Sequence, residues 1–283
     1  MKKPFIIILG LIIYLVATTD DLNGQTDGFN KIRCNREKVF PGLLWKSSHT
    51  DLPGTGPQNI NILIVNTRKR EIALQYNPDK NLPVNLQVDP ANIIAAINGG
   101  FFNIKDGGSV TYIRTEGRIQ ESDTAIKWRR NSNMNGSLLI GLNGRIFIEK
   151  AHLNQWYDDH EEFPEVLLTG PLLLQDKKET ILPETSLVTV KHPRTGIGVR
   201  GRSHILLVTV DGRTESAAGM TLDELTDLML SLKCRNAVNL DGGGSTTMWI
   251  RNEPYNGIVN MPCDNKKFDH EGIRAVSDIV IVR

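Results

Sequence analysis

The sequence predicts an α+β protein, built as a single compact domain around an antiparallel-rich mixed sheet with few helices. Short apolar runs rich in Val, Ile and Leu recur along the chain between turn residues, which is typical of strands. Only residues 221–233 carry apolar side chains at strong helical spacing. No internal repeat or low-complexity linker divides the chain, so one layered domain is the simplest arrangement.

Length and composition exclude several classes of protein. The chain has 283 residues, of which 40% are hydrophobic and 23% are charged. These values exclude disordered, collagen-like and disulfide-dense chains. With 33 basic and 32 acidic residues the net charge is +1, so the composition does not indicate a nucleic-acid partner.

Residues 1–24 have the pattern of a signal peptide. Lys2 and Lys3 precede an apolar run over residues 5–17, and polar residues follow. The run is shorter than the roughly 20 residues of a membrane-spanning helix, and no second long run follows. We therefore expect export to the periplasm, the cell envelope or the medium, with no stable membrane span in the mature chain. An uncleaved N-terminal anchor is the alternative.

Residues 25–59 carry little periodicity and are rich in Gly, Pro and polar side chains. We expect an irregular lead-in there, with a possible strand at residues 42–45, before the main domain of residues 60–283. The three cysteines allow at most one disulfide within a monomer, and Cys234–Cys263 is the candidate pair. Their spacing lacks a zinc signature, and we predict neither a metal nor a cofactor.

Apolar runs bounded by turn residues predict the strands of the main domain. The run at residues 205–210 is apolar throughout, which predicts a strand buried on both faces. Leu142-Asn143-Gly144 indicates a hairpin turn, and Gly170-Pro171 separates another apolar pair. The predicted strands are residues 60–66, 71–76, 137–140, 145–149, 166–169, 172–174, 197–200, 205–210, 237–240, 246–250 and 279–282.

Two helix starts are indicated. Thr221 and Glu224 have the spacing of a capping box, and Lys233 falls in the last turn of that helix, where a cation suits the dipole. Asp89-Pro90 places a cap residue before a proline, which predicts a second start ahead of the apolar run at residues 93–97.

Three turns at strand ends carry the candidate chemistry. They are Asn98-Gly99-Gly100, Asp211-Gly212-Arg213 and Asp241-Gly242-Gly243-Gly244-Ser245, and each follows an apolar run. Two carboxylates delivered in this way suit acid–base or nucleophilic work on a glycosidic bond. Ordinary Asp-Gly turn chemistry is the alternative. It is weakest for Asp241, because three consecutive glycines are costly to order.

Arginine is the second type of candidate residue. Arg194 and Arg274 each lie just before a predicted strand and could grip a phosphate through two parallel hydrogen bonds. Solvated surface charge is the alternative. Ser245 lacks the Gly-x-Ser-x-Gly elbow of serine hydrolases, and no Gly-Lys-Ser/Thr follows the glycines as in a phosphate loop.

Five motifs in a fixed order resemble the phosphodiester glycosidase family. They are Asn-Gly-Gly-Phe-Phe from Asn98, Arg-Thr-Gly-Ile-Gly from Arg194, Asp-Gly-Arg from Asp211, Gly-Met-Thr-Leu-Asp-Glu-Leu from Gly219, and Leu-Asp-Gly-Gly-Gly-Ser from Leu240. The resemblance covers roughly residues 60–283. It implies hydrolysis of the glycosidic C–O bond of a sugar-1-phosphate diester, with an N-acetylglucosamine-like sugar on a phosphorylated glycan. In a bacterial member it also implies an exopolysaccharide-related role.

The resemblance also implies roles for individual residues. Asp241 and Asp211 would be the catalytic carboxylates, and the glycines would present backbone N–H groups as an anion nest. Asn98 would bind the sugar or orient a carboxylate, and the two arginines would hold the phosphodiester. Asp278 departs from the family pattern, which has an amide at this position. The implied substrate-binding residues are Asn98, Gly99, Arg194, Thr195, Gly242, Gly243, Gly244, Ser245, Thr246, Arg274 and Asp278.

Two other functions stay open on the same fold. One is a non-catalytic envelope protein that binds glycans, which exposed Trp128, Trp156 or Trp249 beside the site would favour. The other is a phosphodiesterase that cleaves the P–O bond, which usually requires a metal.

Overall fold

The computed structural model describes residues 29, 32, 34–77, 81–121 and 133–283. The predicted signal peptide and Trp128 lie outside the described residues. Among the residues that are described, no helix has the length and apolar character needed to cross a membrane.

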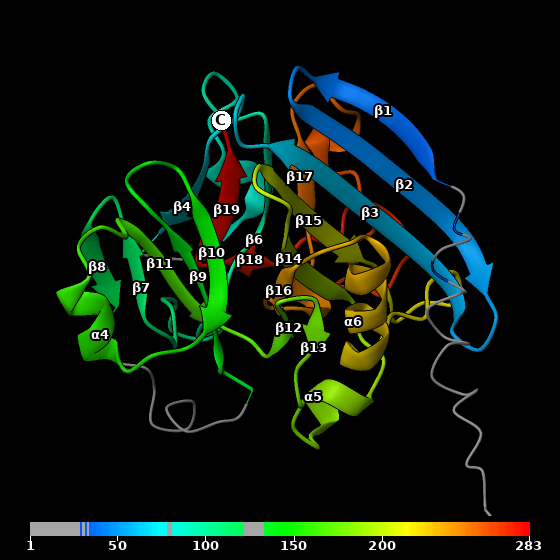
Figure 1. The fold of residues 1–283 in the computed structure, drawn as a ribbon. Helices are drawn as coiled ribbons and strands as arrows, with labels where there is room; N and C mark the ends of the chain where they lie inside the picture. Colours follow the sequence, from blue (N-terminus) through cyan, green and yellow to red (C-terminus); the bar gives the residue numbers. More distant parts are fainter. Residues whose placement is uncertain (1–28, 30–31, 33, 78–80, 122–132) are drawn as a thin grey trace, which may run out of the picture.

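The largest sheet has eight strands in the order β1-β2-β3-β15-β14-β16-β12-β13, and every neighbouring pair is antiparallel. Figure 1 shows it on the right of the molecule. Its strands are β1 (Asn35–Phe40), β2 (Leu43–Leu52), β3 (Gly56–Asn66), β12 (Leu172–Gln175), β13 (Lys178–Glu179), β14 (Arg194–Arg200), β15 (His204–Val210) and β16 (Asn236–Asn239).

The expectation of an irregular lead-in is therefore wrong for residues 35–59. Strands β1 and β2 and the start of β3 extend the large sheet at its edge. Most of β1 is exposed and its sequence, Asn-Arg-Glu-Lys-Val-Phe, is largely charged. Edge strands commonly carry charge, so the apolar alternation that identifies a strand is missing there.

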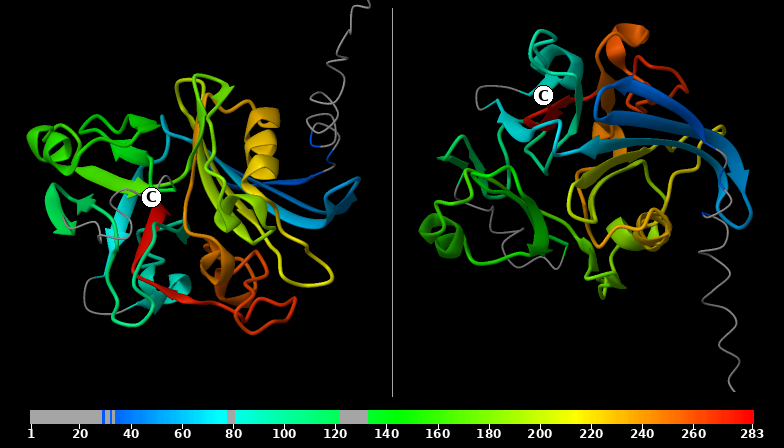
Figure 2. Two further views of the ribbon diagram at one scale, coloured as in Figure 1. Left: turned by 90° about the horizontal axis from the view of Figure 1, so that it is seen from below. Right: turned by 45° about the horizontal axis from the view of Figure 1, so that its top comes forward.

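The other strands form three smaller sheets, again with antiparallel pairs throughout. Their orders are β10-β9-β11-β7-β8, β17-β6-β19-β4 and β18-β5. Figures 1 and 2 show the five-stranded sheet beside the eight-stranded one. The strands are β4 (Ile72–Tyr76), β5 (Leu82–Pro83), β6 (Ala95–Asn98), β7 (Ile113–Thr115), β8 (Arg118–Glu121), β9 (Gly136–Ile140), β10 (Ile146–Lys150), β11 (Glu165–Thr169), β17 (Met248–Ile250), β18 (Ala275–Val276) and β19 (Asp278–Val282).

The predicted antiparallel α+β class is confirmed, and each predicted strand overlaps an observed one. The predicted hairpin at Leu142-Asn143-Gly144 joins β9 to β10. The chain at Gly170-Pro171 behaves differently, because β11 and β12 belong to different sheets. This turn therefore carries the chain from the five-stranded to the eight-stranded sheet.

The longest helix is confirmed, with its capping box. Thr221 Oγ1 accepts the Glu224 N–H at 3.1 Å, and Glu224 Oε2 accepts the Thr221 N–H at 2.8 Å. Helix α6 ends at Ser231, so Lys233 lies beyond it with φ of 64° rather than in its last turn. The helices are α2 (Val84–Gln87), α4 (Asn154–Asp159), α5 (Ser186–Thr189) and α6 (Leu222–Ser231), with 3₁₀ turns η1 (Gly243–Ser245) and η2 (Tyr255–Gly257).

The second predicted helix start is wrong. The Asp89 carbonyl accepts the Asn92 and Ile93 N–H groups, which closes a single turn. The chain then enters strand β6, because the apolar run that follows pairs with β17 and β19 in the interior.

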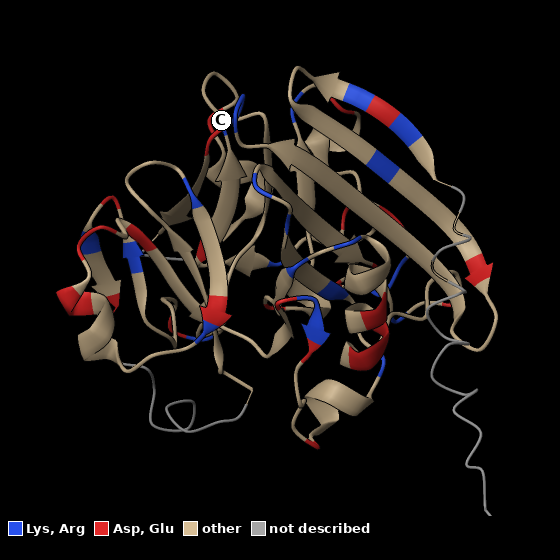
Figure 3. Ribbon diagram, in the orientation of Figure 1, with Lys and Arg blue, Asp and Glu red and all other residues tan. Residues whose placement is uncertain are grey.

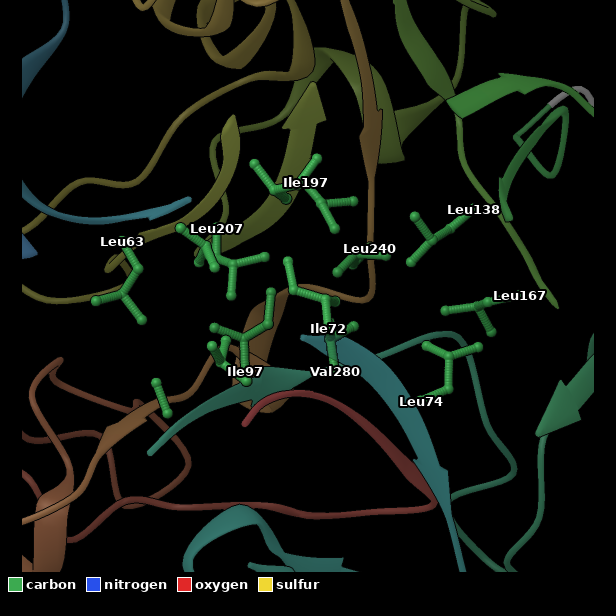
Figure 4. Close-up of a cluster of buried hydrophobic side chains, with 14 of the residues drawn as sticks. Leu63, Ile72, Leu74, Ile97, Leu138, Leu167, Ile197, Leu207, Leu240 and Val280 are labelled. Atoms are coloured by element: carbon green, nitrogen blue, oxygen red, sulfur yellow. The ribbon is translucent and has the colours of Figure 1, made fainter. Parts of the chain in front are cut away.

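One hydrophobic cluster joins three sheets. Leu63, Ile197 and Leu207 come from the eight-stranded sheet and are fully buried. They meet Ile97 and Leu167 from the two neighbouring sheets (Figure 4). Fully burying one such side chain stabilises the fold by about 1.5–3 kcal/mol. This shared core fixes the strand ends of different sheets relative to one another.

All three cysteines are free thiols, so the predicted Cys234–Cys263 pair is wrong. Cys234 Sγ lies against Met229 Sδ at the end of α6. Cys263 instead lies in the loop before β18, where its backbone forms an isolated parallel β-bridge with Gly272.

Candidate active site

The three predicted turns meet at one edge of the large sheet. Strands β15 and β16 both pair antiparallel with β14, so they run in the same direction and end at the same edge. Asp211 follows β15 and Asp241 follows β16. Asn98, at the end of β6, reaches this edge from the four-stranded sheet and donates from Nδ2 to the Asp241 carbonyl at 2.7 Å.

Asn98 holds the turns together from inside. Its Oδ1 accepts the Thr195 hydroxyl at 2.8 Å and the Thr247 N–H at 3.1 Å, and its side chain is fully buried. Thr195 also donates to the Thr246 hydroxyl at 3.3 Å. Asn98, Thr195 and Thr246 therefore support the site from beneath. Because the Asn98 amide is buried and already hydrogen-bonded, it is not placed to make the predicted contact with a sugar.

Asp241 is the catalytic candidate that faces outward. Its side chain is partly exposed, and its Oδ1 accepts the N–H of Gly242 at 3.0 Å. Burial raises its pKa to about 6, against the opposing effects of the Ser245 hydroxyl and Arg274. At neutral pH the group is ionised, and the Ser245 hydroxyl, Arg274 and the Gly242 N–H stabilise its charge. Such a carboxylate is suited to contact with a developing positive charge.

Asp211, the second carboxylate predicted to be catalytic, is interior. Its side chain is 1% exposed, and its two oxygens accept three donors. Asn260 donates at 2.7 Å, Asn59 at 2.7 Å and the Met261 N–H at 2.9 Å. Burial raises the pKa of Asp211 to about 6 in spite of these donors. Its role is therefore to fix the loop that begins at Asn260.

Arg194 is also interior, which corrects the prediction that it grips a phosphate. Thr195 points into the site, so its strand neighbour Arg194 points to the opposite face of the sheet. The guanidinium is 1% exposed and donates to the carbonyls of Met220, Leu187 and Val190 at 2.7, 2.7 and 2.8 Å. It ties the segments around α5 and α6 to the sheet.

Arg274, the second arginine predicted to hold the phosphodiester, lies over the glycine turn. It forms a bidentate pair with Asp264, with Nε–Oδ2 at 2.8 Å and Nη2–Oδ1 at 2.7 Å. A Cβ on Gly244 would overlap both partners of this pair, so the pair lies directly on the glycine and would have to shift for any larger residue. The Asp264 carboxylate raises the pKa of Arg274 further, and Asp241 acts in the same direction. Arg274 thus sets a permanent positive charge beside Asp241.

Arg213 is a second cation at this turn, and the sequence interpretation missed it as a site residue. Its guanidinium lies 3.0 Å from the position that a Cβ on Gly243 would occupy, and Gly243 has φ of +62°. Arg213 Nη2 also lies 3.2 Å from His192 Nδ1. Burial lowers the pKa of His192, and the charges of Arg194 and Arg213 lower it further. The position of Arg213 directly after Asp211-Gly212 is the signal that could have identified it.

The predicted anion nest does not form at the first two glycines. The Gly242 N–H is bonded to the Asp241 carboxyl, and the Gly243 N–H donates to the Pro193 carbonyl at 2.8 Å. The Ser245 and Thr246 N–H groups bond back to the turn itself. These amides are therefore already engaged, and the free donors at the turn are those of the two guanidiniums above it.

Gly99 and Asp278 shape the neighbouring turn without facing outward. Asp278 is 1% exposed and accepts the Gly100 N–H at 2.6 Å and the Ser277 hydroxyl at 2.7 Å. A Cβ on Gly99 would overlap Asp278 Oδ1. Burial raises the pKa of Asp278. The carboxylate that replaces the family amide therefore acts as an acceptor for backbone and hydroxyl donors.

The glycine turn brings the partly exposed Asp241 together with Arg274, which is paired with Asp264, and with Arg213, which also lines an open cleft. This cleft of about 660 Å³ is lined by Arg213, Lys266 and Phe268, together with residues 214–216. Of the tryptophans that would favour glycan binding, Trp249 is 4% exposed and Trp156 stacks on His160 in α4. In the described part of the chain, no three His, Cys, Asp or Glu residues gather as a metal site.

Comparison with known proteins places this geometry in a wider group. The sequence profile described as phosphodiester glycosidase matches residues 91–283. The N-acetylglucosamine-1-phosphodiester alpha-N-acetylglucosaminidase of Bos taurus is 26% identical over 172 residues, which are 56% of this chain and 31% of that protein. The SPbeta prophage-derived uncharacterized protein YomE of Bacillus subtilis is 38% identical over 95 residues, 31% of this chain and 14% of that protein. The chain thus spans about a third or less of these curated relatives.

Solved structures show the same fold. The catalytic domain of the zebrafish N-acetylglucosamine-1-phosphodiester alpha-N-acetylglucosaminidase, auto-inhibited by its pro-peptide, has a TM-score of 0.71 at 20% identity. The match covers 89% of this chain and 87% of that one. A hypothetical protein from Synechocystis has a TM-score of 0.65 at 13% identity, over 88% of this chain and 63% of its own.

Proposed function

Because the chain belongs to the phosphodiester glycosidase family, we propose that it is an exported hydrolase of sugar-1-phosphate diesters. The bond cleaved is the glycosidic C–O bond, and the substrate is an N-acetylglucosamine-like sugar on a phosphorylated glycan. The activity in the name of the cattle relative supports this substrate class. The leader pattern of residues 1–24 supports export.

The placement of Asp241 beside Arg274 and Arg213 carries the proposal. The phosphodiester would lie against the two guanidiniums. The Nε and Nη2 groups of Arg274 are held by Asp264, so its contact with a phosphate oxygen would come from Nη1. As the C–O bond breaks, the leaving phosphate gains charge, and fixed cations stabilise that charge in the transition state. A phosphate is a fair leaving group on its own, so a second carboxyl acting as an acid is less necessary.

The Asp241 carboxylate would act on the sugar. Glycosidic cleavage gives the anomeric carbon oxocarbenium character, and a nearby carboxylate can stabilise that charge or activate water. A raised pKa of about 6 keeps the group ionised at neutral pH while making it a usable base.

The position of oxygen incorporation tests the proposal. Secreted mature protein would be incubated with diesters of α-N-acetylglucosamine-1-phosphate in ¹⁸O water. Label on the C1 oxygen of the released sugar is the expected result, and label on the phosphate would mean P–O cleavage. Asp241→Asn should abolish turnover, whereas Asp227→Asn is the matched control, because Asp227 on α6 also has a pKa of about 6 outside the site. Binding without turnover of any diester would identify a glycan-binding protein instead.

A further inference from the structure

A second cleft, of about 820 Å³, opens at the opposite ends of β14 and β15 from Asp241. It lies where edge strand β10 of the five-stranded sheet meets β14 and β16 (Figure 1). Asn236 closes this seam by donating from Nδ2 to the Ile148 carbonyl at 2.6 Å. Strand β15 runs from His204 at the cleft to Val210 at the site, a length of about 20 Å at the usual rise of a strand.

Arginines from three separate turns converge on this cleft. Arg68 follows β3, Arg145 precedes β10, and Arg202 joins β14 to β15. All three are exposed, and none has an ion pair with a carboxylate in the part of the chain described. Figure 3 shows basic segments at these turns. Positive charge without a partner, gathered from distant parts of the chain, favours an anionic ligand.

The acidic residues of the cleft are already engaged. Asp176 accepts from Arg235 at 2.6 Å, and Glu149 contacts His152 at 3.1 Å. The environment of His204, also in the cleft, agrees with a positive potential: burial lowers its pKa, and nearby arginines, Arg68 among them, lower it further. The charge balance at the opening is therefore positive.

The floor of the cleft is apolar. Ile146 and Val199 are half-buried there, packed against the same hydrophobic cluster. The ring of Phe147, the next residue on β10, packs against Phe163 on the other face of the sheet, and the Arg145 guanidinium lies 5.2 Å from its centre. A bare inorganic anion gains nothing from such a floor. A sugar carrying a phosphate presents both an apolar ring face and a charge, which match the two surfaces of the cleft.

We propose that this cleft binds a phosphorylated sugar of the glycan chain at a distance from the bond that is cleaved. The identity of the glycan rests on the proposed function. A polymer would then be held at two points, and the second contact raises its apparent affinity through effective concentration. A diester of one sugar, which cannot span both sites, gains nothing.

Binding of a defined oligomer tests the cleft directly. The probe is a fluorescent tetramer of N-acetylglucosamine joined by 1-phosphodiesters, titrated into Asp241→Asn protein so that it is not cleaved. Adding Arg145→Ser and Arg202→Ser should weaken binding about tenfold. The control pair, Lys105→Ser and Arg118→Ser, also removes two exposed positive charges but outside the cleft, and should leave affinity unchanged.

Equal affinities of the two double variants would overturn the proposal. The proposal would also be overturned if single-stranded DNA of equal charge bound as tightly as the tetramer and if the cleft variant weakened both affinities equally. That result would mean general attraction of polyanions. Melting temperatures confirm that both variants fold, which is expected because all four side chains are exposed.

Kinetics separate this inference from the proposed function. With Asp241 intact, the cleft variant should raise KM for the tetramer about tenfold at constant kcat and leave a simple diester unaffected. If the wild type turns the tetramer over and the cleft variant binds it with unchanged affinity, the inference about the cleft is wrong and the proposed function stands. Absence of turnover in the wild type, with binding still lost in the cleft variant, would overturn the proposed function alone.

Discussion

Asp211 and Asp241 end two strands that flank β14, yet their surroundings are opposite. Asp211 is buried and receives three donors, all from other parts of the chain. Asp241 is partly exposed and receives the N–H of its own neighbour, Gly242, with Arg274 nearby. Burial raises the pKa of each to about 6.

The difference shows that a raised pKa does not by itself identify a catalytic carboxylate. Structural carboxyls are perturbed as strongly as reactive ones, so access and the number of donors must decide. Asp211 holds Asn260 and Met261 and hence the loop that carries Asp264. Asp241 has oxygen lone pairs that remain for a ligand. One strand end therefore builds the site, and the other is the one that the proposed function assigns to catalysis.

The largest expected effect comes from Asp241→Asn. We expect kcat/KM to fall about a thousandfold, because a carboxylate that stabilises charge in the transition state is removed. The melting temperature should change little, because the volume is kept and a carboxylate whose burial is unfavourable is replaced by a neutral amide. Steady-state kinetics and calorimetry on the same samples check this. A parallel loss of stability and activity would make Asp241 a structural turn residue as well.

Asp211→Asn should give the reverse pattern. The new amide has only one acceptor oxygen, and its NH₂ group would face the Nδ2 donor of Asn59 or Asn260. One of these buried donors therefore loses its acceptor. We expect unfolding to become easier by about 2–4 kcal/mol, with activity of the folded protein within about tenfold of wild type. Denaturant unfolding measures the first and kinetics at low temperature the second. Loss of activity without loss of stability would restore Asp211 to the catalytic pair.

The two arginines sharpen the same contrast. Arg274→Lys keeps the charge but removes the bidentate contact, and should lower kcat/KM for diesters about 10- to 100-fold with little change for neutral glycosides. Arg194→Lys removes buried hydrogen bonds to three carbonyls and should lower stability by about 1–3 kcal/mol without changing selectivity. Rates with matched charged and neutral substrates decide. A changed selectivity in Arg194→Lys would contradict the interior position of its guanidinium.

The sequence predicted most of the longer strands, the α6 capping box and the turn that carries Asp241, because each depends on neighbouring residues. It could not distinguish Asp211 from Asp241, since the donors to Asp211 come from Asn59 and Asn260, which are distant in sequence. Arg194 was misplaced for a related reason. Which face of β14 turns toward the site is set by pairing with β15 and β16, and a one-residue shift reverses it.

The pH dependence is the smallest expected effect. Both carboxyls should contribute to the pH dependence of stability, but only Asp241 should contribute to that of activity. A carboxyl whose pKa rises from 3.8 to about 6 on folding binds more protons when folded, so its contribution to stability is full below about pH 3.8 and is lost as the pH rises through about 6. Activity should run the other way, rising through about pH 6 as Asp241 ionises and falling about tenfold at one unit below.

Ser245→Ala tests which group sets that rise. The Ser245 hydroxyl lowers the pKa of Asp241, so its removal should move the rise in kcat/KM to higher pH. Asp227→Asn, outside the site, should leave the rise in place while altering stability between about pH 4 and pH 6. If the rise in kcat/KM stays at the same pH in Ser245→Ala, it belongs to a group other than Asp241. The carboxyl that acts on substrate would then have to be sought among the neighbours of Arg274, with Asp264 first, because it lies over Gly244 in the same turn.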